Sequence, residues 1–182
     1  MGNKAIFLDR DGTLIEDKDY LSNPDEVVIY PGATDALRKL SRAGFKLVIV
    51  TNQSGVGRGY FTLADVENVH RHLLDQLECQ GVLIDKIYVA PEAPDQASRG
   101  RKPSPQFLFD ARDELGIDLT RSYMIGDKLI DLACGWNAGV KRSILVRTGY
   151  GAKIEVQKAP ELARAVVADD LAAAATWILS HD

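Results

Sequence analysis

The sequence has few cysteines, few histidines and no long hydrophobic run, and each shortage excludes a class of protein. It contains two cysteines and three histidines in 182 residues. Cys79 and Cys134 are too few for a disulfide framework and are not spaced as a metal-binding pair. No apolar run approaches the length of a membrane span, and residues 1–4 lead directly into a predicted strand, without a signal-peptide pattern. We therefore expect a cytoplasmic protein with no membrane partner.

An excess of positive charge is also absent. The chain has 22 Lys and Arg residues against 26 Asp and Glu residues, for a formal net charge of -4. Without a basic stripe, this balance argues against a nucleic-acid partner. The apolar content of 46% is ordinary for a globular protein, and the length allows a sizeable core without disulfides. We expect residues 1–182 to form one domain and the protein to be a monomer.

Predicted strands alternate with predicted helices along the chain. Five apolar runs predict buried strands, at residues 6–8, 46–50, 87–89, 123–125 and 144–146. Capping residues and apolar spacing predict helices at residues 33–43, 63–79, 105–115, 129–138 and 170–179. Thr62 and Ser104 are the predicted N-caps of the second and third helices, and Pro105 would occupy the first turn of the third. The alternation predicts an α/β fold, a three-layer α/β/α sandwich with a central parallel sheet.

The first predicted strand ends in Asp9-Arg10-Asp11-Gly12-Thr13, a polar sequence that suits a working surface. Two aspartates two residues apart can have different catalytic roles, because one can attack or bind a cation while the other transfers a proton. Gly12 allows a tight turn or a close approach of the backbone to a ligand.

Other predicted strands are followed by polar groups as well: residues 51–55, Arg101-Lys102 and Asp127-Lys128. In parallel sheets, ligands bind beyond the carboxyl ends of the strands, so these groups are expected to meet. Carboxylates suit Mg²⁺, whereas hydroxyl, amide and lysine groups suit phosphate. His70 and His72 are predicted on the surface of a helix, and no histidine lies near these segments. The pattern therefore favours Mg²⁺-dependent phosphoryl transfer with an aspartate nucleophile.

Four of these segments resemble the four motifs of haloacid-dehalogenase (HAD) superfamily phosphatases: residues 9–13, 51–55, Lys102 and residues 126–131. Residues 101–103 and 145–149 extend the similarity to the D-glycero-D-manno-heptose 1,7-bisphosphate 7-phosphatase family, whose near relatives are the histidinol-phosphate phosphatases. The similarity covers residues 4 to about 150. It implies a HAD-like, Rossmannoid domain. Residues 16–30 and 89–105 are too short for a large cap domain.

The resemblance implies a role for each matching residue. Asp9 would attack phosphorus, and Asp11 would protonate the leaving oxygen and later deprotonate water. Mg²⁺ would be held by the Asp9 carboxylate, the Asp11 backbone carbonyl and Asp127, while Thr51 and Lys102 would hold phosphoryl oxygens. Substrate or phosphate binding is further implied for Asp17, Tyr20, Asn52, Gln53, Ser54, Arg101 and Lys128. Two alternatives stay open for Asp131: support of the metal site, or a first-turn helix residue favoured by the dipole.

Many members of this family carry a zinc-binding loop, Cys-x-His followed by Cys-x-Cys. The corresponding positions here are Ala90-Pro91-Glu92 and Ser98-Arg99-Gly100, which contain none of the four ligands. Glu92 and Ser98 cannot replace a thiolate cage, so we expect no structural zinc.

The sequence therefore predicts a Mg²⁺-dependent phosphomonoesterase that acts through an aspartyl-phosphate. The resemblance implies removal of the 7-phosphate of D-glycero-D-manno-heptose 1,7-bisphosphate. Histidinol phosphate or another small phosphorylated metabolite is the alternative substrate. A phosphate-binding module without turnover is a third hypothesis, against which the intact Asp9/Asp11 pair argues.

Overall fold

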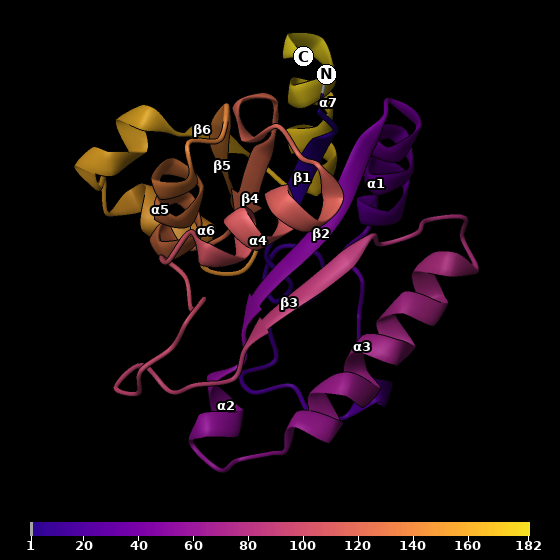
Figure 1. Cartoon of the computed structure of the whole chain (residues 1–182), viewed down its shortest axis with the longest axis vertical. Helices are drawn as coiled ribbons and strands as arrows, with labels where there is room; N and C mark the ends of the chain where they lie inside the picture. The colour runs from indigo at the N-terminus through magenta and orange to yellow at the C-terminus, as the bar shows by residue number, and fades with distance from the viewer. Residues whose placement is uncertain (1) are drawn as a thin grey trace.

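Six strands form the central sheet of the computed structural model, which describes residues 2–182 (Figure 1). The strands are β1 (Lys4–Leu8), β2 (Phe45–Asn52), β3 (Lys86–Ala90), β4 (Tyr123–Gly126), β5 (Arg142–Val146) and β6 (Val166–Ala168). Their order is β3-β2-β1-β4-β5-β6, and every neighbouring pair is parallel. The predicted parallel α/β sheet is confirmed. β6 adds a sixth strand at the edge, where three residues were too short for a strand pattern.

Helices cover both faces of this sheet. They are α1 (Ala33–Arg42), α2 (Ser54–Gly57), α3 (Leu63–Glu78), α4 (Gln106–Leu115), α5 (Leu129–Ala138), α6 (Gly151–Val156) and α7 (Leu171–His181). One buried cluster joins α1, α3 and α7 to one side of the strands, and a second joins α4 and α5 to the other. Alternate residues of β1 divide between them, with Ile6 and Leu8 in the first cluster and Phe7 in the second. The three-layer sandwich is thereby confirmed.

The starts predicted for α3 and α4 from capping residues lie at or within one residue of the observed starts. Thr62 and Asp65 form a capping box at the start of α3, as predicted, because each side chain accepts the other residue's N–H. The predicted start of α4 is one residue early, since Pro105 is the N-cap and the Ser104 hydroxyl accepts the N–H of Gln106. The sequence patterns missed α2 and α6, because helices of four and six residues present no full apolar stripe.

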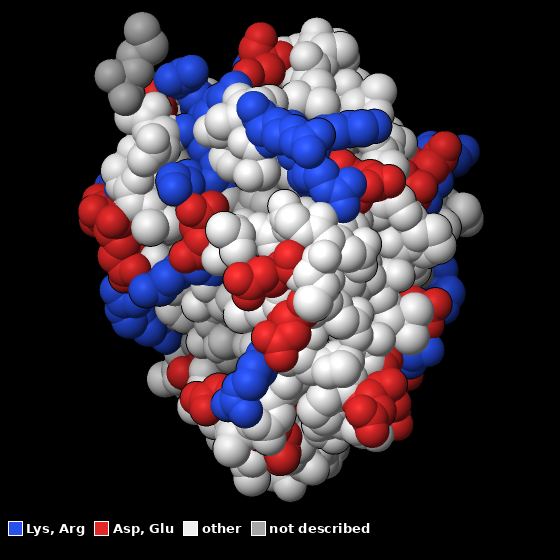
Figure 2. Space-filling view, turned by 90° about the vertical axis from the view of Figure 1, so that its right-hand side faces the viewer, with Lys and Arg blue, Asp and Glu red and all other residues white. Residues whose placement is uncertain are grey.

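No helix among residues 2–182 combines the length and the apolar character needed to span a bilayer. Lys and Arg side chains lie beside Asp and Glu side chains on the face that carries α1 and α3, as Figure 2 shows. This face therefore presents mixed charge rather than a continuous basic stripe.

Candidate active site

The carboxyl ends of the parallel strands bring the predicted polar residues to one edge of the sheet. Asp9 directly follows β1, Asn52 ends β2 and Asp127 directly follows β4. Lys102 reaches the same place from the loop after β3, because its Nζ lies 2.6 Å from Asp9 Oδ1. The predicted convergence at this edge is therefore observed.

Lys102 is buried between two carboxylates. Its Nζ lies 2.7 Å from Asp131 Oδ1 and donates to the Val50 carbonyl at 2.7 Å. Asp131 Oδ2 accepts the Lys128 N–H at 2.9 Å, which caps α5. One Asp131 oxygen therefore caps α5, as the first-turn alternative requires, and the other holds the lysine next to Asp9, while support of the metal site by Asp131 stays a prediction.

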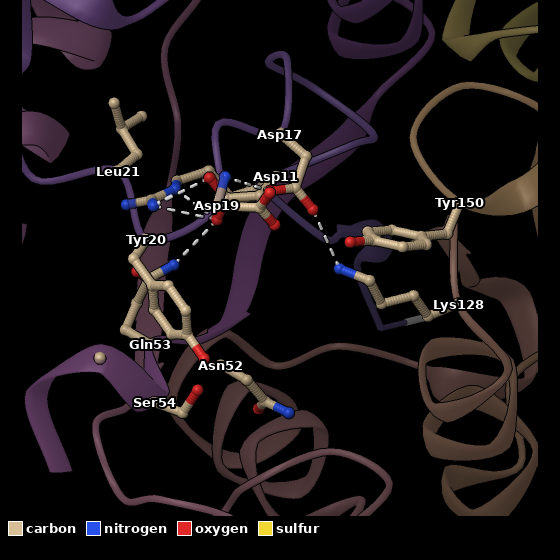
Figure 3. A pocket seen from close by; sticks show the side chains of 12 residues that line it. Asp11, Asp17, Asp19, Tyr20, Leu21, Asn52, Gln53, Ser54, Lys128 and Tyr150 are labelled. Carbon is tan, nitrogen blue, oxygen red and sulfur yellow. Dashed lines mark hydrogen bonds and ion pairs between the residues drawn. The ribbon is translucent and has the colours of Figure 1, made fainter. Parts of the chain in front are cut away.

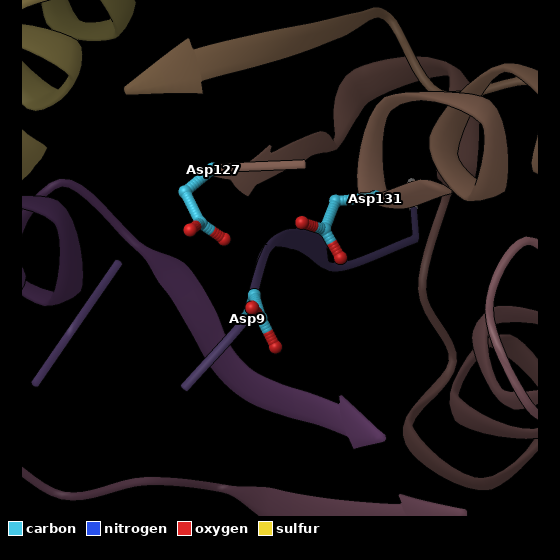
Figure 4. A group of neighbouring side chains, drawn as sticks. All are labelled: Asp9, Asp127 and Asp131. Carbon is cyan, nitrogen blue, oxygen red and sulfur yellow. The ribbon is translucent and has the colours of Figure 1, made fainter. Parts of the chain in front are cut away.

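Three buried carboxylates, those of Asp9, Asp127 and Asp131, form a group that fits a divalent cation (Figure 4). Each offers one oxygen, and these oxygens lie within 4.8 Å of one another. Asp127 Oδ2 accepts the Tyr150 N–H at 2.8 Å, whereas buried Asp127 Oδ1 has no hydrogen-bond partner among residues 2–182. A buried carboxylate oxygen without a partner is unfavourable, and an all-oxygen donor set suits Mg²⁺.

The raised pKa values in this group also favour a bound cation. Burial, with a smaller effect of the Asp131 and Asp127 charges, raises the pKa of Asp9 to about 8, although the Lys102 charge opposes the shift. Burial likewise raises the pKa of Asp127 to about 6. Burial works to lower the pKa of Lys102, but the Asp131 and Asp9 carboxylates outweigh it and raise the pKa above its usual value. Lys102 contacts the Asp9 and Asp131 carboxylates, and the Lys128 charge acts to lower the pKa of Asp127. Because the Asp9 and Asp127 pKa values stay raised despite these charges, a bound cation would relieve the repulsion among the carboxylates.

Two glycines leave room for the Asp127 carboxylate. Gly12 has a φ of +81°, and a Cβ at this position would lie 2.3 Å from Asp127 Oδ2. A Cβ at Gly149 would lie 2.2 Å from the same oxygen. The Thr148 hydroxyl donates to the Gly12 carbonyl at 2.6 Å and joins the two loops. Both glycines are therefore needed for the close approach of backbone to carboxylate.

We expect Gly12→Ala to weaken Mg²⁺ binding, because the new methyl group would displace the Asp127 carboxylate. The apparent Mg²⁺ affinity should fall by about 10- to 100-fold, as for other groups that orient a metal ligand. A Mg²⁺ titration of phosphate release and calorimetric Mg²⁺ binding would measure it. Gly81→Ala is the matched control, since Gly81 has a φ of +76° and no atom within 4 Å of the added Cβ. Equal losses in both variants would contradict the prediction.

Asp11 is held apart from the three-carboxylate group. Arg10 Nε donates to Asp11 Oδ2 and Arg10 Nη2 to Asp11 Oδ1, both at 3.0 Å. Gln53 Nε2 donates to Asp11 Oδ2 at 2.9 Å and to Thr51 Oγ1 at 2.8 Å. The resemblance assigns only the backbone carbonyl of Asp11 to the metal, so its carboxylate is free to act elsewhere in the site.

The prediction that His70 lies on the surface is wrong. Its side chain is buried, with 7% exposed, and its Nε2 lies 3.0 Å from Arg10 Nη1. His70 follows Val69 and precedes Leu73 by three positions on the buried stripe of α3, a spacing that the sequence did contain. His70 is therefore far from the strand-end segments in the sequence but in contact with Arg10 in the structure. His72 is half-buried and contacts Gln76 instead.

Burial, and then the Arg10 charge, lower the pKa of His70 from 6.5 to about 4. Because the unfolded chain binds this proton more readily, His70 destabilises the fold as the pH falls through this window. The contribution of His70 to the unfolding free energy should therefore fall by about 3 kcal/mol between about pH 6.5 and about pH 4. Urea unfolding across this range would show this contribution as a pH-dependent difference of about 3 kcal/mol between the wild type and His70→Gln, and no such pH-dependent difference for His72→Gln. Parallel curves for His70→Gln and the wild type would contradict this assignment.

Two adjoining cavities contain most of the predicted substrate residues, and Figure 3 shows the larger of them. The larger, of 230 Å³, is lined by Arg10, Asp11, Asp17, Asp19, Tyr20, Leu21, Asn52, Gln53, Ser54, Gly55, Lys128 and Tyr150. The smaller, of 170 Å³, is lined by Asp9, Asp11, Asn52, Ser54, Arg101, Lys102, Lys128, Ile130 and Asp131. Thr51 lines neither and lies behind Gln53, which donates to its hydroxyl.

The loop that carries Arg101 and Lys102 is fixed by hydrogen bonds. The Asn52 amide accepts the Lys102 N–H at 3.0 Å and donates to the Lys102 carbonyl at 3.2 Å. The Ser98 hydroxyl donates to Glu92 Oε2 at 2.6 Å and accepts the Arg101 N–H at 3.1 Å. Arg101 Nη1 donates to the Glu92 carbonyl at 3.0 Å. Glu92 and Ser98, at two of the family's zinc positions, thus bind each other and Arg101.

Asp19 and Tyr150 are cavity residues that were missing from the predicted set. Asp17 pairs with Lys128 at 3.2 Å, and the Lys128 ammonium lies 4.7 Å from the centre of the Tyr150 ring (Figure 3). Asp19 and Tyr20 have φ values of 46° and 66°, a strained conformation that occurs at functional sites. The sequence could have indicated that Tyr150 lies at the site, because Tyr150 directly follows residues 145–149, which resemble the family.

Comparisons with known families agree with this geometry. The profile of the family described as polynucleotide kinase 3 phosphatase matches residues 4–136. The profile of the HAD-hydrolase-like family matches residues 100–174. Together these profiles extend over the sheet, the three carboxylates and the loop that carries Lys102.

Curated relatives and solved structures match over most of the chain. A protein of Escherichia coli strain K12 named D-glycero-beta-D-manno-heptose-1,7-bisphosphate 7-phosphatase is 42% identical over 164 residues, which is 86% of each chain. The Haemophilus ducreyi protein of that name is 41% identical, over 89% of this chain and 93% of that one.

The crystal structure of D,D-heptose 1,7-bisphosphate phosphatase from B. bronchiseptica, complexed with magnesium and phosphate, has a TM-score of 0.89 and 36% identity. It covers 98% of this chain and 99% of that one. The corresponding Burkholderia thailandensis structure has a TM-score of 0.72 and 32% identity, over 97% and 99% of the two chains. With its fold, its strand-end carboxylates and these relatives, the chain belongs to the HAD superfamily of phosphatases.

Proposed function

We propose that this phosphatase removes the 7-phosphate of D-glycero-D-manno-heptose 1,7-bisphosphate. The observation that carries the proposal is the buried Asp9–Lys102 pair next to Asp127, in a chain whose relatives share that activity in their names. The neighbour crystallised with magnesium and phosphate supports the same chemistry. The substrate itself is inferred from relatives that are about two-fifths identical to this chain.

The catalytic roles that we propose for this chain are those that the family resemblance implies for the matching residues. Asp9 attacks phosphorus, the bond to the sugar oxygen breaks, and Asp11 donates a proton to that oxygen. Asp11 then takes a proton from the water that hydrolyses the aspartyl-phosphate. Lys102 stabilises the negative phosphoryl oxygens next to Asp9. The phosphate contact implied for Thr51 stays a prediction, because Thr51 lines neither cavity and its hydroxyl accepts from Gln53. Mg²⁺, held by Asp9, Asp127 and the Asp11 carbonyl, would neutralise phosphoryl charge when bound.

The cavities suit a small, highly hydroxylated phosphate ester. Carboxylates, amides and a lysine line the larger cavity, and these groups hydrogen-bond to sugar hydroxyls. Arg101 lines the smaller cavity, where its guanidinium can bind two oxygens of a second phosphate. No large cap covers the site within residues 2–182, which leaves substrate selection to these loops.

A second candidate substrate is a 3′-phosphorylated nucleic acid, because the polynucleotide kinase 3 phosphatase profile matches residues 4–136. The net charge of -4 disfavours a polyanionic partner. Histidinol phosphate and other small metabolites stay open as alternatives.

Phosphate release with Mg²⁺ from a substrate panel would test the proposal. The panel contains both anomers of the heptose bisphosphate, fructose 1,6-bisphosphate, histidinol phosphate and a short 3′-phosphorylated oligonucleotide. We expect one of the heptose bisphosphates to have a kcat/KM about 100-fold or more above those of the other substrates, because its hydroxyls can pair with the polar groups of the cavity. Low, similar rates on all substrates would overturn the heptose assignment, and a leading oligonucleotide would replace it. An inactive wild type would favour the binding module.

We also infer that Mg²⁺ alone supports activity and that the protein holds no structural zinc. Among residues 2–182, the single group of three clustered metal-ligating side chains is the aspartate group. The Glu92–Ser98–Arg101 hydrogen bonds support the loop in place of a zinc cage. Elemental analysis should find no stoichiometric zinc, and Mg²⁺ alone should restore activity after EDTA. Stoichiometric zinc, or a requirement for it, would contradict the inference.

The cytoplasmic location, the monomeric state and the single domain expected from the sequence stay predictions. Size-exclusion chromatography with light scattering would measure the oligomeric state directly.

A further inference from the structure

Arg10 is a fully buried guanidinium whose donors reach two different residues. Nε and Nη2 each donate to one oxygen of the Asp11 carboxylate at 3.0 Å. Nη1 lies 3.0 Å from His70 Nε2, which is 60 positions away in the sequence. Because the guanidinium is planar, two parallel hydrogen bonds fix the plane of the Asp11 carboxylate as well as its position.

His70 accepts the third hydrogen bond. A guanidinium has no acceptor atom, so His70 Nε2 must present its lone pair and the imidazole must be neutral, with its proton on Nδ1. Burial and the Arg10 charge keep the pKa of His70 low, which maintains this neutral form near neutral pH. His70 itself is held by α3, whose buried stripe packs in the core. The contact therefore connects a rigid helix to the guanidinium.

The Asp11 carboxylate lies where both cavities meet, since it lines each of them. Gln53 Nε2 donates to Asp11 Oδ2 at 2.9 Å and supports it from the β2 side. With Arg10 on one side and Gln53 on the other, the carboxylate is held in one orientation at the cavity wall.

We propose that His70 and Arg10 are positioning residues that hold the Asp11 carboxylate at the leaving oxygen of the substrate. His70 acts through Arg10 and does not touch the substrate. This proposal rests on the proposed function, in which Asp11 transfers the proton. Neither residue has a role in the motif assignments drawn from the family resemblance.

The test compares His70→Leu and His70→Gln in the full chain on two esters. Leu cannot accept a hydrogen bond from Arg10, whereas the Gln carbonyl can. Misplacement of Asp11 should lower kcat of His70→Leu on a sugar phosphate by about 100-fold and leave KM little changed. With 4-nitrophenyl phosphate, the rate of the first turnover, in which 4-nitrophenolate is released and Asp9 is phosphorylated, should change much less, because this leaving group departs without a proton. Later turnovers should be slow with this ester too, because Asp11 also activates the water that hydrolyses the aspartyl-phosphate. His70→Gln should recover most of the activity on the sugar phosphate.

His72→Leu is the matched control, because His72 lies on the same helix, contacts Gln76 and lines neither active-site cavity. It should keep wild-type kinetics on both esters. A loss in the first-turnover release of 4-nitrophenolate as large as the loss on the sugar phosphate, or no recovery in a His70→Gln protein that melts like the wild type, would overturn the proposal.

A double-mutant cycle separates this proposal from the proposed function. If His70 acts through Asp11, His70→Leu should cost little in an Asp11→Asn background, where the positioned carboxylate is gone. Full additivity would overturn the positioning role while leaving the phosphatase mechanism intact. Wild-type activity of Asp11→Asn alone would overturn the role of Asp11, and the proposal with it. ¹⁵N NMR would check independently that His70 is protonated on Nδ1; the opposite tautomer would overturn the proposed contact.

Discussion

Asp9→Asn should abolish turnover while the fold and the cavity remain. The amide keeps the shape of the carboxylate but lacks the nucleophilic oxygen, so kcat should fall by about 10⁴-fold or more. Asp9 Oδ1 is the oxygen that pairs with Lys102 at 2.6 Å, and it belongs to the three-carboxylate group. Steady-state phosphate release with Mg²⁺ would measure the loss.

A trapping experiment shows whether Asp9 is the nucleophile rather than a structural partner. Acid-quenched wild type should yield a phosphorylated peptide that contains Asp9, and Asp9→Asn should yield none. Asp11→Asn should still be phosphorylated by 4-nitrophenyl phosphate, because Asp11 is not attacked. Phosphorylation of Asp9→Asn, or turnover near the wild-type rate, would refute the assignment. Thermal melting with Mg²⁺ controls for misfolding.

Lys102→Met should cost both stability and activity. Lys102 pairs with Asp9 and Asp131 at 2.6 and 2.7 Å in a buried environment. Removing one partner of a buried ion pair costs about 3–5 kcal/mol, because the remaining charge is left without a partner. Loss of an electrostatic donor at the phosphoryl group should lower kcat by a further factor of about 10²–10³. Urea unfolding and steady-state kinetics would measure the two effects.

Two further variants separate the two effects. Adding Asp131→Asn should restore part of the stability, because the amide is neutral and its oxygen can still accept the Lys128 N–H, but it should not restore activity. Lys46→Met removes an exposed pair with Asp85 and should cost less than about 1 kcal/mol. A stable, active Lys102→Met protein would contradict the assigned role of Lys102.

Parallel strand topology explains why so much of the site was accessible from sequence. Residues 9–11, 51–52 and 127–128 are far apart in the chain, yet each follows or ends a strand of one parallel sheet. All carboxyl ends of such a sheet lie at the same edge, so the strand pattern by itself brings these groups together. The short helices and β6 escaped prediction because a few residues carry no periodic signal.

The contacts of individual side chains were harder to predict from the sequence. Asn52 is predicted to bind substrate and lines both cavities, and its amide also makes two hydrogen bonds to the Lys102 backbone, which the sequence did not indicate. Gln53 was assigned likewise, and it connects Asp11 to Thr51. A motif names which residues surround a ligand, but the partner of each polar atom depends on where the neighbouring loops run.

The sequence by itself determined the parallel α/β fold, the edge at which the site lies and the carboxylates and lysine that meet there. It did so because strand ends and polar groups are local features of the chain. Only the tertiary structure decided that Asp131 holds Lys102 and that His70 contacts Arg10. These contacts depend on how α5 and α3 are rotated against the sheet, and that rotation is set by core packing around each helix rather than by any one segment.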